Sequence, residues 1–85
     1  MNKKLTGRFF RENVICDKII KSKDQIKFRN YFFYTHGRTA ESFKNGIEKQ
    51  LTKLGIDFQL IDYCENWQAW PKDSYFEVII KLEEI

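Results

Sequence analysis

A single strongly periodic helical segment, with strand-like segments on either side of it, constrains the fold of this chain most. Its apolar side chains recur at spacings of four, four and three and so line one side of an α-helix: Phe43, Ile47, Leu51 and Leu54. Thr39 is expected to cap the start of this helix, and Gly55 is expected to lie just after its end. Gly46 within this helix is less favourable than alanine. We expect it to lie where the helix crosses the sheet closely.

Two strand-like segments precede the helix. Residues 14–20 are rich in β-branched side chains, and residues 25–35 also have the composition of a strand. The polar residues 21–24 between them predict a turn, so the two strands are expected to form a hairpin.

Two further strand-like segments follow the helix. Residues 56–63 alternate as far as Leu60, where the alternation slips by one residue and predicts a β-bulge. Pro71, in the aromatic connection that follows, argues against a central strand there. Residues 75–82 have an apolar side chain at every second position, and four of them are expected to face the core: Phe76, Val78, Ile80 and Leu82.

The resulting order of elements, ββαββ, predicts an α+β fold. We expect a two-layer sandwich, in which a four-stranded, mostly antiparallel sheet carries the one helix on one of its faces. The 85 residues are expected to form a single domain, 1–85, with residues 1–8 loose at the amino terminus. The other face of the sheet is then open, and it is the expected place of a binding site.

The second predicted strand gives this open face a basic and aromatic character. One side of the strand, which begins with Ile26, suits the helix. Because side chains alternate along a strand, the other side carries two cations followed by two rings: Lys27, Arg29, Tyr31 and Phe33. Rings stack on bases and cations neutralise phosphates, so this pattern predicts a platform for single-stranded RNA or DNA. The alternative is that aromatic side chains from elsewhere in the chain cover the two rings.

The distribution of charge favours a nucleic-acid partner. Residues 1–38 contain ten Lys and Arg and three Asp and Glu, a net charge of +7, whereas the whole chain carries only +3. A basic half within a nearly neutral chain predicts one positive face. Four further basic residues are expected at the margins of the platform: Arg8, Arg11, His36 and Arg38.

Two other functions stay open. Residues 64–76 contain rings that are costly to expose, and three are candidate protein-contact residues: Trp67, Trp70 and Tyr75. They favour a second hypothesis, a phage- or mobile-element-type inhibitor or antitoxin with a counter-defence role, which neutralises a protein such as a nuclease. A third hypothesis is a small ribonuclease that uses His36. A ribonuclease needs a second acid–base group, which Asp17, Asp62 or Glu65 would supply only if the fold brought one of them beside His36. We therefore expect a binding protein and no enzyme.

No catalytic group, cofactor or metal site is predicted. Cys16, His36 and Cys64 are isolated in the sequence and lack the paired spacing of zinc ligands. No apolar run approaches the ~18 residues of a membrane span, and no signal-peptide pattern is present, so the expected location is the cytoplasm. A homodimer through an edge strand is compatible with all three functional hypotheses.

Overall fold

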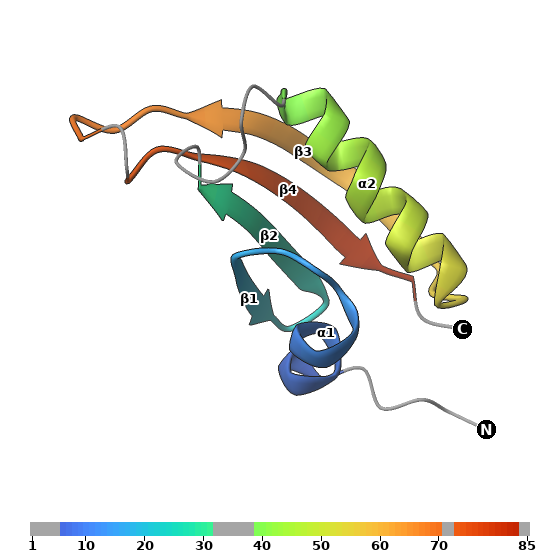
Figure 1. Cartoon of the computed structure of the whole chain (residues 1–85). Coiled ribbons are helices and arrows are strands. Elements are labelled where there is room, and N and C mark those ends of the chain that lie inside the picture. Colours follow the sequence, from blue (N-terminus) through green and yellow to red (C-terminus); the bar gives the residue numbers. More distant parts are fainter. Residues whose placement is uncertain (1–5, 32–38, 71–72, 84–85) are drawn as a thin grey trace.

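One antiparallel sheet forms the centre of the fold. The computed structural model describes residues 6–31, 39–70 and 73–83. Within them, four strands form a sheet of spatial order β1-β2-β4-β3, and each neighbouring pair is antiparallel. The strands are β1 (Lys18–Ser22), β2 (Gln25–Tyr31), β3 (Phe58–Asn66) and β4 (Tyr75–Leu82) (Figure 1). The predicted α+β class and four-stranded sheet are confirmed.

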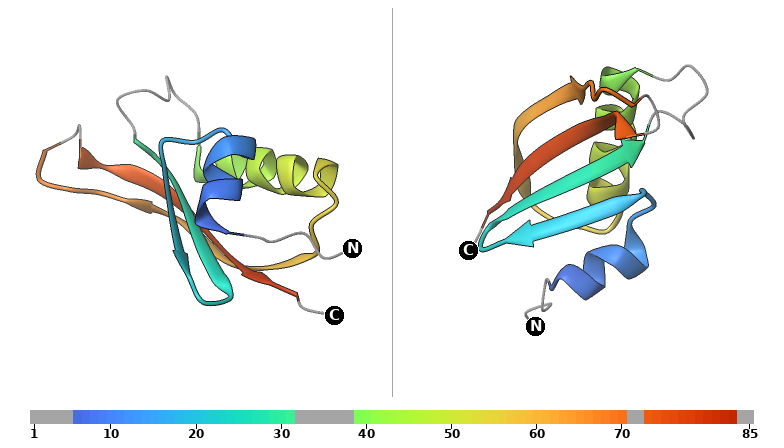
Figure 2. Two further views of the ribbon diagram at one scale, coloured as in Figure 1. Left: turned by 90° about the horizontal axis from the view of Figure 1, so that it is seen from below. Right: turned by 90° about the vertical axis from the view of Figure 1, so that its left-hand side faces the viewer.

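Two helices, α1 (Gly7–Asn13) and α2 (Ala40–Lys53), lie on the same side of this sheet (Figure 2). The first contacts β1, and the second contacts β3 and β4. Gln50 of α2 also binds the segment between α1 and β1, because its Oε1 accepts a hydrogen bond of 2.8 Å from the backbone N–H of Ile15. Buried side chains from both helices and the sheet form one core, with these members at its centre: Phe10, Ile26, Phe28, Ile47, Leu51, Val78 and Ile80.

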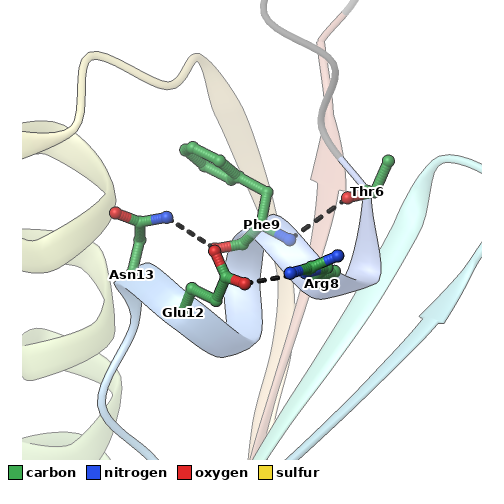
Figure 3. Close-up of polar contacts among 5 residues, drawn as sticks. All are labelled: Thr6, Arg8, Phe9, Glu12 and Asn13. Atoms are coloured by element: carbon green, nitrogen blue, oxygen red, sulfur yellow. Dashed lines mark hydrogen bonds and ion pairs between the residues drawn. The ribbon is translucent and has the colours of Figure 1, made fainter.

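The helix α1 is a correction to the sequence prediction, which has a loose chain to residue 8. The predicted first strand, at residues 14–20, is also displaced, since β1 begins at Lys18 and ends at Ser22. Thr6 caps α1 by accepting a hydrogen bond from the backbone N–H of Phe9, and Arg8 pairs with Glu12 one turn later (Figure 3). A helix this short is marginal in isolation and too brief to show a repeat in the sequence. Packing stabilises it, because Phe10 is fully buried and meets the Phe28 ring edge-on at 6.2 Å.

The helix α2 follows its prediction closely. Thr39 and Ser42 form a capping box at its start, and the backbone of Gly55 after its end has a φ of +74°, which glycine adopts without strain. The expectation for Gly46 is wrong. It lies on the exposed side of the helix, and a Cβ placed on it would meet nothing within 4 Å.

The strand register confirms most of the predicted faces. Ile26 and Phe28 of β2 lie opposite Ile80 and Val78 of β4, and all four side chains are fully buried on the helix-covered face. The predicted bulge is present, since the pairing of β3 with β4 shifts between Leu60 and Asp62. The second strand is described as far as Tyr31, and residues 32–38 of its predicted range lie outside the described residues.

Candidate nucleic-acid interface

The face of the sheet opposite the helices carries the three described residues of the predicted platform. Directly opposed residues in an antiparallel ladder share a face. Lys27, Arg29 and Tyr31 alternate with the buried Ile26 and Phe28, so their side chains emerge on the open face. Phe33, the fourth predicted member, lies outside the described residues.

Arg29 has an intramolecular partner that the sequence does not reveal. Its Nε lies 2.6 Å from Oε2 of Glu77, which sits directly opposite on β4. The two side chains are only 20% and 10% exposed. Burial alone would lower the pKa of Arg29, but the hydrogen bond and negative charge of Glu77 outweigh it and raise the pKa. Arg29 is therefore a fixed, charged element of the face and is not a fully solvated side chain.

The Arg29 guanidinium also orders two rings. It lies 4.4 Å from the centroid of the Tyr75 ring, within the range of a cation–π contact. The Tyr75 ring meets the Tyr31 ring edge-on at 5.9 Å. Tyr75, which the sequence places in a protein-contact segment, belongs to the open face, directly opposite Tyr31 in the ladder. Both rings are half-buried, so each keeps part of its surface accessible to a ligand.

Two lysines on this face are available for phosphate. Lys27 lies in the ladder between Ile20 and Ile79, and Lys18 lies opposite Arg29. Among the described residues neither lysine forms an ion pair. Lys18 is a member that sequence reasoning missed. The sequence places Lys18 in the predicted first strand but does not show which residue lies opposite it. Only the register of β1 with β2 brings Lys18 beside Arg29.

Arg8 and Arg11 lie on α1, which packs on the helix-covered side of the sheet. Both side chains are exposed, and Arg8 is engaged by Glu12 at 2.8 Å (Figure 3). The structure thus places them on a separate element and does not bring them onto the open face. His36 and Arg38 lie outside the described residues.

The cysteines are free thiols on different elements. Cys16 precedes β1, and burial is the main cause that raises the pKa of its thiol from 9.0 to about 11. Cys64 of β3 lies opposite Glu77 of β4. Burial is the largest cause that raises the pKa of its thiol, and the negative charges of Glu77 and Asp62 raise it further. Within residues 6–31, 39–70 and 73–83, no three His, Cys, Asp or Glu side chains are grouped as metal ligands would be. In the same residues, no helix is long and apolar enough to cross a bilayer.

The two tryptophans are among the most exposed large side chains of the described structure. Trp67 is 69% exposed and Trp70 is 68% exposed. Their backbone is anchored, because the N–H of Gln68 donates to Oγ of the fully buried Ser74 at 2.8 Å. Both candidate protein-contact tryptophans therefore lie at the surface, whereas Tyr75 separates from them.

Comparisons with known proteins give one partial similarity. The chain is 34% identical over 64 residues to an NADPH–cytochrome P450 reductase of Dictyostelium discoideum. The match covers 73% of this chain but spans only 10% of that relative's length. No protein family matches the sequence, and no solved structure matches it. Because the match spans a tenth of the reductase, it does not assign the activity of that enzyme to this chain.

Proposed function

We propose that this protein binds single-stranded nucleic acid, RNA or DNA, on the open face of its sheet and that it acts without catalysis. The observation that carries the proposal is that, within the described part of the chain, lysines without an ion pair lie near two ordered tyrosine rings on the face opposite the helices. Lys18 and Lys27 supply positive charge, and Tyr31 and Tyr75 supply surfaces on which bases stack.

The paired Arg29 gives this interface a rigid centre. Since Glu77 neutralises it and Tyr75 packs against it, its role in the proposal is to hold the Tyr75 ring in place. Phosphate binding then falls mainly to the two lysines, and base stacking to the rings. A face of this composition binds any single strand by its backbone charge and stacking, with little preference for sequence.

The test is fluorescence anisotropy of labelled single-stranded RNA, single-stranded DNA and duplex DNA, titrated with the wild-type protein and three variants. Tyr31→Leu keeps an apolar side chain but removes the ring, and we expect it to weaken single-strand binding about tenfold. Lys27→Ala is expected to weaken binding a few-fold, whereas the matched control Lys49→Ala removes an exposed cation of α2 and should leave it unchanged.

Two results would contradict the proposal. The first is the absence of binding to all three nucleic acids at low salt. The second is binding that Tyr31→Leu and Lys27→Ala leave at the wild-type level, which would place the interface elsewhere.

A further inference from the structure

The outer edge of β3 and the segment after it form a second surface, whose side chains lie on both faces of the sheet. Asp62 lies opposite Ile79 and belongs to the open face, whereas Tyr63 and Glu65 lie opposite Val78 and Phe76 on the helix-covered face. We call it the β3 edge surface, and its members are Ile61, Asp62, Tyr63, Glu65, Trp67 and Trp70. All six side chains are exposed. Residues 57–70 contain three acidic residues and no Lys, Arg or His. The segment itself is therefore acidic and attracts positive charge, and Nζ of Lys44 of α2 already lies 5.3 Å from the centroid of the Tyr63 ring.

The two edges of the sheet differ in how they are protected. Natural proteins guard an edge strand by keeping it short and by placing lysines on it. The edge strand β1 has five residues and includes Lys18 and Lys21. The edge strand β3 has nine residues, with neither lysine nor proline, and its one irregularity is the bulge beside Ile61. By this criterion β1 is the better protected edge. On β3 the bulge and a hydrogen bond of 2.8 Å from the N–H of Tyr63 to Oδ1 of Asp62 protect one place, and the rest of the strand can accept another strand.

The tryptophans extend this edge on an ordered backbone. Besides the Gln68–Ser74 hydrogen bond, the N–H of Asp73 donates to the carbonyl oxygen of Trp70 at 2.9 Å. The backbone that carries the rings is thus fixed by hydrogen bonds. This reduces the conformational entropy that would be lost when a partner binds. Tryptophan is also the ring that best binds a lysine or arginine side chain through its face.

We propose that the β3 edge surface binds an extended, basic segment of another protein, which pairs with β3 as an added strand. Backbone hydrogen bonds to β3 would supply the pairing. Asp62 on the open face and Glu65 on the helix-covered face would each attract the cations on its own side of the segment. Trp67 and Trp70 would stack on its lysine or arginine side chains. A second copy fits less well, because two β3 edges repel each other by charge. Pairing of β3 with the basic β1 of another copy is head-to-tail, and it would build a ring or a filament instead of a two-fold dimer.

The test uses a fluorescein-labelled peptide of nine residues, as long as β3, in which lysine and valine alternate. A peptide with glutamate in place of lysine tests charge, and one with N-methylated backbone amides tests strand pairing. We expect the lysine peptide to bind the full chain and both controls to bind at least tenfold more weakly. In ¹⁵N-labelled protein, the amide signals of β3 should shift on binding, and those of β1 should not.

Protein variants locate the contact. The combined change Trp67→Ala and Trp70→Ala is expected to weaken peptide binding about tenfold, because exposed rings of this kind are typical interface anchors. Glu65→Lys should weaken it several-fold, whereas the matched control Glu41→Lys, an exposed acid on α2, should not. Thermal unfolding of each variant shows that the fold is kept, as expected for exposed side chains.

Three results would overturn the inference. The first is no binding of the lysine peptide at low salt, and the second is equal binding of the lysine and glutamate peptides. The third is a concentration-dependent dimer of the wild-type chain that the tryptophan changes abolish, which would identify a second copy as the occupant. None of these outcomes depends on nucleic-acid binding, because the peptide assay contains no nucleic acid.

Discussion

The pair formed by Arg29 and Glu77 is expected to contribute measurably to stability, and Glu77→Gln tests this. The substitution keeps the size of the side chain but removes the charge that faces the guanidinium across 2.6 Å. A hydrogen bond to a charged group contributes about 1.5–3 kcal/mol. The guanidinium is 20% exposed, so water offsets only part of the loss, and the contact with Tyr75 remains. We expect Glu77→Gln to lower the free energy of unfolding by about 2 kcal/mol.

The chain contains a matched control for this substitution. Arg8 and Glu12 form a pair with a similar distance, 2.8 Å, but their side chains are 82% and 59% exposed. An exposed pair one turn apart on a helix contributes only about 0.3–0.5 kcal/mol. Glu12→Gln should therefore leave the unfolding free energy almost unchanged, although it removes the same type of charge.

The assay is equilibrium unfolding in urea with thermal melts alongside. For a domain of this size about 2 kcal/mol corresponds to a fall in Tm of roughly 10 °C. Combining Glu77→Gln with Arg29→Met should cost less than the sum of the single changes, with a coupling of about 1–3 kcal/mol. If Glu77→Gln costs no more than Glu12→Gln, burial does not strengthen this pair and the reasoning is refuted.

Three further predictions concern the core, α2 and the thiols. Phe10→Ala should lower the unfolding free energy by about 3–5 kcal/mol, measured in urea, because the ring is fully buried; an unchanged value would mean that α1 does not dock. Gly46→Ala should raise the Tm through a gain of about 1 kcal/mol, whereas Gly55→Ala, at a φ of +74°, should lower it; the opposite order would contradict the assigned backbone conformations. Cys16 has a folded pKa of about 11 against 9.0 for an ordinary thiol, so its contribution to stability is complete below pH 9 and is lost as the pH rises through 11. Mass spectrometry after iodoacetamide treatment at about pH 9.5 should show slower alkylation of Cys16 in native than in denatured protein, and equal rates would contradict the raised pKa.

Local patterns were sufficient to predict the elements that satisfy their own sequence preferences. The strand β4 has the predicted bounds and the predicted buried side chains, because Glu77 and Lys81 on its other side leave the side of Val78 and Ile80 as the one to bury. The capping box and the glycine after α2 are likewise properties of a few neighbouring residues. The bulge near Leu60 was visible as a slip in the alternation of β3.

Features that depend on distant contacts could not be predicted in this way. The helix α1 owes its stability to Phe10, whose burial requires the assembled sheet. Arg29 and Glu77 are 48 residues apart in the chain, and they meet because β2 and β4 are neighbours in the order β1-β2-β4-β3. Period-two alternation places both on the open face, but only the register shows that they neutralise each other and that Tyr75 joins them.

The salt dependence of RNA binding tests the central claim about the open face most directly. Binding of labelled single-stranded RNA is measured over a range of salt concentrations for the wild type and for Lys18→Ala and Lys27→Ala. Two lysine–phosphate contacts predict a slope of log K against log salt of about −1.4, and each variant should reduce its magnitude by about 0.7. Slopes of both variants equal to that of the wild type would contradict the account, since neither lysine would then contact phosphate.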